Sequence, residues 1–209
     1  MVQQNTLRKR ENTRAQLISA GMEVFLRKGL AGARIDDVVK ASGFTRGAFY
    51  SNYSAIEELM EDVIRTKSQE VFSEVERIFG EIPDPPSLED IVAVIGGLRE
   101  YGRDMYVLST EYTLHQMRNQ LSDGLQIITG TSPAEFVGGL IEDVLSRMGR
   151  ISLIPTRMVA QVLSVLYMDS VVAKELNSES RTTPKFFEDV IRLTIESFTV
   201  PADEASVLE

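Results

Sequence analysis

The sequence has no cysteine, one histidine and no long apolar run, and each of these absences excludes a class of protein. Without cysteine there is no disulfide framework, no thiolate metal site and no cysteine nucleophile. A multi-histidine metal centre is excluded because His115 is the only histidine. The longest uncharged apolar stretch, Met158 to Met168, is too short to cross a bilayer. We therefore expect no metal, no cofactor and no catalytic residues, since no Gly-rich phosphate loop or nucleophile constellation is visible either.

The N-terminus, MVQQNTLRKR, also lacks the apolar segment of a signal peptide, so we expect a cytoplasmic protein. The formal net charge is −9, but its distribution is uneven. Residues 1–53 carry nine Lys or Arg against four acids, whereas the rest of the chain carries 13 basic and 27 acidic residues. This contrast favours a basic head that binds a polyanion, although a solvated helical surface can show the same bias.

Apolar residues recur at helical spacing through nearly the whole chain, and we expect an all-α fold of eight to ten helices without a sheet. The first helix is expected to end at Gly29, a usual C′ residue. A capping box at Ser54–Glu57 opens a helix over residues 54–80, which would be roughly 38 Å long and could join two domains. Prolines interrupt the pattern after it, and later helix starts are read at Ser87, at Ser132–Pro133 and at Thr183–Pro184.

Residues 34–53 have the pattern of a helix-turn-helix, with the turn at Ala41–Thr45. Gly43 suits a left-handed backbone position, and the Thr45 hydroxyl can accept from the free amides of the next helix. On that helix Arg46 and Tyr50 lie one turn apart and share a face. No acid occurs between residues 37 and 57, as a surface that enters a DNA groove requires.

An arginine on this face can bind guanine edges or phosphates, and hydroxyl groups can bind phosphate oxygens. The alternative is a helical corner with a solvated Arg and Tyr, because helix-turn-helix geometry also occurs in proteins that bind no DNA.

Residues 8–64 resemble the DNA-binding domain of the TetR family of bacterial transcriptional repressors. The segment from Ile35 to Tyr53 resembles the second and third helices of that family. Within it, Arg46–Tyr50 is similar to the signature stretch, in which a basic or polar residue and Gly precede a small, an apolar and an aromatic residue. Upstream, four positions fit the first helix of the family: Ala20, Val24, Phe25 and Gly29.

The resemblance implies an N-terminal three-helix DNA-binding domain over residues 8–55, linked by the helix 54–80 to a helical effector-binding and dimerisation domain over residues 56–200. Residues 1–7 and 201–209 are expected to be flexible ends. It further implies that Gly47 lets the backbone approach DNA, that Phe49 is core and that Tyr50 reaches a phosphate.

Two positions depart from the family pattern, and both affect DNA binding. Arg34 stands where a Ser or Thr often caps the second helix, and Ile56 stands where a Lys is frequent. We therefore expect a larger contribution from a basic N-terminal arm. The expected DNA-binding residues are Arg8, Lys9, Arg10, Arg34, Thr45, Arg46, Gly47, Ala48, Tyr50 and Ser51.

In proteins similar to this one the last two helices pair with those of a second copy in a four-helix bundle. The helix expected from Thr156 to Leu176 is apolar on all sides, which favours such an interface, although a centrally buried helix in a monomer would look alike. The expected interface residues are Val162, Val165, Leu166, Phe187, Val190 and Ile191.

An effector pocket is expected near residues 104–119, where apolar and polar side chains share one stripe. A core hydrogen bond between Glu111 and His115 is the alternative for the two polar members. The expected lining residues are Tyr101, Met105, Leu108, Glu111, Tyr112, His115 and Phe136.

Taken together, these patterns predict a DNA-binding transcriptional regulator and not an enzyme. We expect a repressor that binds a palindromic DNA operator as a homodimer and is released by a small-molecule effector, with no membrane partner. Two alternatives stay open. One is a helical ligand-binding protein or enzyme whose N-terminal domain docks another protein, and the other is a DNA-binding regulator with no effector.

Overall fold

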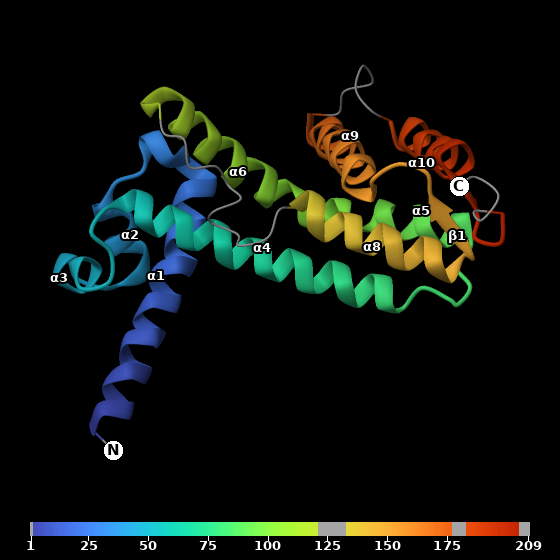
Figure 1. Cartoon of the computed structure of the whole chain (residues 1–209). Helices are drawn as coiled ribbons and strands as arrows, with labels where there is room; N and C mark the ends of the chain where they lie inside the picture. Colours follow the sequence, from blue (N-terminus) through green and yellow to red (C-terminus); the bar gives the residue numbers. More distant parts are fainter. Residues whose placement is uncertain (1, 121–132, 177–182, 205–209) are drawn as a thin grey trace. The chain divides into compact units, whose positions relative to one another are not determined.

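The protein is almost entirely helical in the computed structural model, which describes residues 2–120, 133–176 and 183–204 (Figure 1). The described residues form nine helices and two short strands. This confirms the expected all-α class. The helices are α1 (Val2–Gly32), α2 (Ile35–Ser42), α3 (Arg46–Tyr50), α4 (Ile56–Gly80), α5 (Leu88–Gly97), α6 (Arg99–Asn119), α8 (Pro133–Arg147), α9 (Thr156–Leu176) and α10 (Pro184–Phe198), and the strands are β1 (Arg150–Ser152) and β2 (Thr199–Pro201).

The two strands correct the expectation that the chain has no sheet. They pair antiparallel, with Ile151 opposite Val200. Arg150 strengthens the pair by donating from Nε to the Thr199 hydroxyl at 2.6 Å and from Nη2 to the Thr199 carbonyl at 2.9 Å. Strands of three residues are too short to show the alternation by which a strand is read from sequence.

Several helices begin where the sequence predicts, because a side chain accepts from the free backbone amides there. Ser87 accepts from the Asp90 amide at 3.1 Å, and Thr183 accepts from the Phe186 amide at 3.1 Å. At α4 the expected capping box is displaced by one residue. The amide and hydroxyl of Ser54 both donate to Glu58, at 2.7 and 2.9 Å, because α4 begins at Ile56 and Glu58 is its third residue.

The chain divides into two compact units, and their boundary differs from the predicted one at residue 55. The first unit, called here the head, comprises residues 2–69 together with α6 from Asp104 onward. The second unit, called here the body, comprises residues 70–103 and the described residues from 133 onward. The two long helices α4 and α6 each contribute to both units.

Each unit has its own apolar core. In the head, α1, α2, α3 and α4 bury one cluster together with two residues of α6; its largest members are Leu17, Phe25, Phe49, Tyr53, Leu59, Met60, Ile64, Leu108 and Tyr112. In the body, α5, α8 and α10 bury a smaller cluster of Ile91, Val144, Phe187 and Ile191. Within the described ranges, no helix combines the length and apolar character that a membrane span needs.

Both chain ends contain regular structure within the described residues. Residues 1–7 and 201–209 were expected to be flexible ends. Helix α1 begins at Val2, and β2 extends to Pro201. The basic N-terminal segment is therefore part of a helix.

Candidate nucleic-acid interface

The turn between α2 and α3 has the geometry of a helix-turn-helix. Gly43 ends α2 in the left-handed region, with φ of 72° and ψ of 9°, which a residue with a Cβ adopts only at a cost. Thr45 then begins α3, and its hydroxyl accepts from the Ala48 amide at 3.2 Å. Both predictions made for this turn are confirmed.

Helix α3 presents opposite faces to the core and to solvent. Phe49 is fully buried in the head core, as expected. Tyr50 beside it is 55% exposed, and its ring meets the Phe49 ring edge-on at 5.6 Å. A Cβ added to Gly47 would meet only the Thr45 hydroxyl, at 3.7 Å, so the backbone there is accessible from outside. The face of α3 that carries Arg46, Gly47 and Tyr50 is therefore available to another molecule.

Arg46 forms an ion pair that the sequence did not reveal. Its Nε and Nη2 donate to the two carboxylate oxygens of Asp36 on α2, at 2.5 and 2.6 Å. Hydrogen bonds from Arg46 hold the pKa of Asp36 below its ordinary value, so this carboxylate is ionised at neutral pH. Although residues 38–56 contain no acid, the crossing of α2 and α3 brings one to Arg46, ten residues along the chain.

At the start of α2, Arg34 occupies the cap position without a side-chain cap bond, as the departure from the family pattern implies. Asp37 compensates in part, because its carboxylate accepts from the Arg34 amide at 3.1 Å and from Lys28 Nζ at 2.6 Å. The hydrogen bond from Lys28, chiefly, holds the pKa of Asp37 below its ordinary value. The exposed Arg34 side chain remains a candidate DNA contact.

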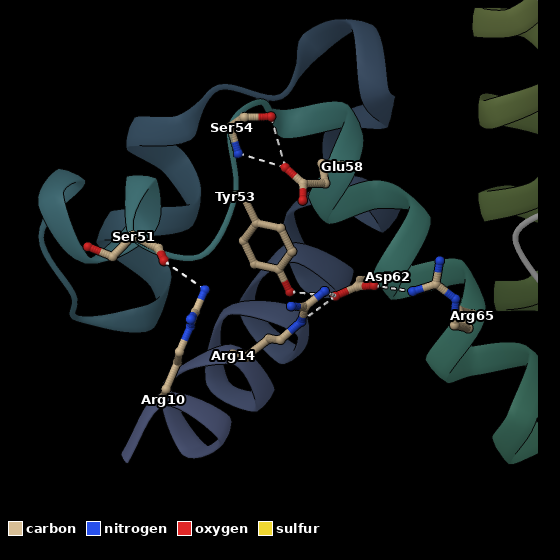
Figure 2. A network of polar contacts seen from close by, with 8 residues as sticks. All are labelled: Arg10, Arg14, Ser51, Tyr53, Ser54, Glu58, Asp62 and Arg65. Carbon is tan, nitrogen blue, oxygen red and sulfur yellow. Dashed lines mark hydrogen bonds and ion pairs between the residues drawn. The ribbon is translucent and has the colours of Figure 1, made fainter. Parts of the chain in front are cut away.

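Of the three basic residues near the N-terminus, Arg10 has a described side chain, whereas the side chains of Arg8 and Lys9 lie outside the described part of the structure. Arg10 Nη2 donates to the Ser51 carbonyl at 3.4 Å, and so links α1 to the end of α3 (Figure 2). The Ser51 hydroxyl donates to the Gly47 carbonyl at 2.8 Å. Arg10 thus lies at the edge of the α3 surface, where the sequence analysis places a DNA contact.

A buried carboxylate holds the segment after α3 against α1 and α4 (Figure 2). Asp62 on α4 accepts from the Tyr53 hydroxyl at 2.9 Å and from Arg14 Nε and Nη2 at 2.7 and 2.6 Å, and it also pairs with Arg65. The Arg14 guanidinium lies 5.1 Å from the centre of the Tyr53 ring. Burial, with the nearby Asp62 carboxylate, raises the pKa of Tyr53 well above its ordinary value, so the hydroxyl stays a donor. Sequence reasoning missed this group because its members come from three separate segments.

Most of the residues expected to line an effector pocket have other partners. Leu108 and Tyr112 fill the head core, and Met105 packs against it. The Tyr112 hydroxyl donates to Glu61 at 3.0 Å. The ring of His115 lies near Asn119, whose Nδ2 is 3.3 Å from His115 Nδ1. In the body, the ring of Phe136 stacks on that of Phe72 at 4.2 Å, and the exposed Tyr101 donates to Glu74 at 3.1 Å.

Glu111, another expected pocket residue, caps the last turn of α1. Its carboxylate accepts from the Leu30 amide at 3.0 Å. This amide follows Gly29, where φ of 68° and ψ of 169° interrupt the helix and where a Cβ would lie only 2.7 Å from a Glu111 oxygen. Glu111 is thus held by the backbone of α1, and a bond to the backbone replaces the Glu–His bond that we considered.

The body contains an open pocket of about 610 Å³ that shares no residue with the expected set. The end of α8, β1 and the loop before α9 form it, with apolar side chains that include Leu145, Ile151 and Leu153. Sequence reasoning did not find it, because its lining comes from separate segments, namely α8, β1, the loop before α9 and Ala202.

The expected interface residues fall into two groups. Val162 and Val165 on α9 are 59% and 66% exposed, whereas Phe187 and Ile191 on α10 are buried in the body core. Leu166 and Val190 are partly buried. The exposed large apolar residues of α10 are instead Phe186, Leu193 and Phe198. On α10, therefore, two of the residues expected at the interface face the core of the protomer.

Comparison with known proteins finds relatives of the part of the chain that carries this surface. The family model of the bacterial regulatory proteins, tetR family, matches residues 17–63, which include α2, α3 and the start of α4. The chain is 27% identical over 112 residues to the uncharacterized HTH-type transcriptional regulator YfiR of Bacillus subtilis (strain 168), covering 53% of this chain and 55% of that protein. It is 33% identical over 57 residues to the HTH-type transcriptional regulator SrpR of Pseudomonas putida, covering 27% of each chain. The matches therefore span about half of YfiR and a quarter of SrpR.

Solved structures share the fold over most of the chain. A TetR-family transcriptional regulator from Mesorhizobium loti MAFF303099 superposes with a TM-score of 0.68 at 14% identity, covering 91% of this chain and 98% of that one. The multidrug binding protein EbrR, solved with imidazole, has a TM-score of 0.61 at 22% identity over 90% of this chain and 91% of its own. A gamma-butyrolactone receptor has a TM-score of 0.58 at 19% identity, and the match covers 95% of this chain and 94% of the receptor.

We predict that Asp62→Ala lowers the free energy of unfolding by about 2 kcal/mol, because the buried Tyr53 hydroxyl loses its acceptor and Arg14 loses its partner. Tyr53→Phe is the control, since it removes the hydroxyl alone and should cost about 1 kcal/mol. Urea unfolding followed by circular dichroism measures both values. Equal losses in the two variants would contradict a central role for the carboxylate.

Proposed function

We propose that the chain is a DNA-binding transcriptional regulator of the tetR family and acts as a repressor, because residues 17–63 match the model of that family and a solved regulator of the family shares the fold. In this proposal it binds a palindromic operator as a homodimer, and a small-molecule effector releases it. The observation that carries the proposal is the outward face of α3, where Arg46, Gly47 and Tyr50 lie exposed over the buried Phe49.

The chemistry of that face suits a DNA duplex. Arg46 can donate to base edges in the major groove, and the hydroxyl groups of Thr45, Tyr50 and Ser51 can bind phosphate oxygens. At Gly47 no side chain stands between the helix backbone and the groove. Ala48 completes the leading edge of the helix, and the cationic residues Arg10 and Arg34 are exposed in the same unit. Residues 1–53 carry an excess of five basic residues, and this part of the head attracts the phosphate backbone although the whole chain is acidic.

Exposed apolar side chains on α9 and α10 support a homodimer. On α9, Met158, Val162 and Val165 are spaced by one turn and then by another, so they share a face. On α10, Phe186 and Leu193 are seven residues apart and likewise share a face. A second copy of the chain would cover these side chains and place two heads on successive major grooves, about 34–36 Å apart. This set replaces Phe187 and Ile191 in the proposed interface, because those two serve the protomer core.

An effector acts only if it binds the DNA-free conformation more tightly than the DNA-bound one. The solved relatives support such a ligand here, since one is called a multidrug binding protein and another a receptor for a gamma-butyrolactone. To shift the ratio of the DNA-free to the DNA-bound conformation from 1:99 to 99:1, the effector must bind the DNA-free conformation about 5.5 kcal/mol more tightly. Leu108 and Tyr112 fill the head core and Met105 packs against it, so Glu111 and His115 on α6 stay our proposed effector contacts.

We predict that Arg46→Ala weakens operator binding at least tenfold, because the side chain that reads the base edge is removed while the fold is kept. The operator is first obtained by selecting bound duplexes from a random library, and affinity is then measured by gel-shift titration. Arg27→Ala is the matched control, since it removes an exposed arginine of α1 that pairs with Glu23. Unchanged operator affinity of Arg46→Ala would refute the assigned role.

We predict that Val165→Glu raises the dimer dissociation constant about a hundredfold or more, because an unpaired carboxylate would be buried in the interface. Sedimentation equilibrium measures the change. Met117→Glu is the control, because it adds the same charge at an apolar residue that is 71% exposed and lies on α6. A Val165→Glu protein that stays dimeric would show that the interface lies elsewhere.

We predict that at least one compound in a screen of metabolites and drugs raises the unfolding midpoint and also releases the operator. At one hundred times its Kd, a ligand that binds only the native state stabilises it by about 2.7 kcal/mol. Thermal-shift assays find such compounds, and gel shift tests release. If every stabilising compound left operator affinity unchanged, the regulator would act without an effector of the kind proposed.

A further inference from the structure

The ion pair between Arg46 and Asp36 lies on the outward surface of the head, where a structural role is small. The Arg46 side chain is 61% exposed and that of Asp36 is 63% exposed. Exposed pairs of this kind contribute little to stability, because water screens both charges. Their geometry is nevertheless well defined, since Nε meets Oδ1 at 2.5 Å and Nη2 meets Oδ2 at 2.6 Å. Two parallel hydrogen bonds of this kind fix the plane of the guanidinium group.

The same two bonds also decide which donors of Arg46 stay available. A guanidinium group has five N–H donors in a rigid plane, one on Nε and two on each Nη. Asp36 accepts the proton on Nε and one proton on Nη2. The remaining proton on Nη2 and the Nη1 proton parallel to it form the end of the fork, next to the edge that Asp36 occupies. This end carries two parallel N–H groups, which match the O6 and N7 acceptors of guanine.

We propose that Asp36 is a positioning residue that sets the base specificity of Arg46: it holds the Nε side of the guanidinium group so that the Nη1–Nη2 edge faces one guanine of the operator. This inference rests on the proposed DNA-binding role of α3 and adds to it the base that is read and the residue that enforces the reading. Asp36 also disfavours an alternative use of Arg46 as a phosphate contact, because its carboxylate would lie close to the phosphate and repel it.

In the competing hypothesis, the ion pair between Arg46 and Asp36 must break before Arg46 can contact DNA. In that case Asp36 would compete with the base, and its removal would strengthen binding to the operator without changing which base is preferred. A positioning role makes the opposite prediction. Without Asp36 the guanidinium group can turn to a phosphate, so preference for guanine falls while affinity for other sequences is kept or rises.

The experiment compares the full-length wild type with Asp36→Ala, Asp36→Asn and Arg46→Ala. Selection from a random duplex library gives the wild-type site, and the position whose base preference disappears in Arg46→Ala is the one that Arg46 reads. Gel-shift titrations with all four base pairs at that position then measure discrimination. We expect the wild type to prefer guanine there by roughly tenfold to a hundredfold. In Asp36→Ala the preference for guanine should fall about tenfold. Asp36→Asn keeps one acceptor oxygen, so its preference should lie between those of the wild type and Asp36→Ala.

Glu23→Ala is the matched control, because it removes the same charge from another exposed acid–arginine pair, formed with Arg27 at 2.9 Å. It should keep the guanine preference. Circular dichroism melting of each variant should match the wild type, which separates a change in base reading from a change in folding. If Asp36→Ala kept the preference for guanine, with or without tighter operator binding, the inference would be overturned. The same holds if the wild type prefers a base other than guanine at the position that depends on Arg46. A wild type that binds no duplex at all would instead overturn the proposed function, and the inference with it.

Discussion

The burial of Phe49 is the contact on which the DNA-facing surface depends. Helix α3 has only five residues, and a helix of that length is unstable without tertiary contacts. Phe49 anchors it in the head core, and the buried Tyr53 holds the chain that leaves it through the Asp62 carboxylate. These two aromatic side chains are turned inward, whereas Arg46 and Tyr50 are exposed. The orientation of the surface is therefore a consequence of the packing beneath it.

Features that depend on neighbouring residues could be predicted from the sequence. The Thr45 cap, the left-handed Gly43 and the buried Phe49 all follow from local rules of helix ends and spacing, and the structure has each of them. The order of the helices followed from apolar periodicity for the same reason. Even the small displacement at α4, where Glu58 rather than Glu57 meets Ser54, reflects only where one helix begins.

Features that depend on distant segments could not be predicted in this way. The pairing of Arg46 with Asp36 follows from the crossing of two helices, and the contact of Glu111 with the Leu30 amide joins residues 81 apart in the sequence. Phe187 and Ile191, expected at an interface, are buried within the protomer, and the sequence does not reveal this because every turn of α10 carries apolar side chains. Which of them faces inward depends on α5 and α8, which pack against Phe187 and Ile191, and leaves Phe186 and Leu193 exposed.

The division of α4 and α6 between the two units bears on how a ligand could control DNA binding. Both helices are continuous, so each links head residues to body residues without a loop between them. At the head end, α4 supplies Asp62, which fixes Tyr53, and α6 supplies Glu111, which caps α1 beside the left-handed Gly29. A rigid helix that shifts along its axis moves its side chains together, and packed cores respond by moving between discrete arrangements rather than by bending continuously. Under the proposed function, an effector bound along α6 would contact the helix that supplies Glu111, and so would act on the backbone of α1 at Leu30.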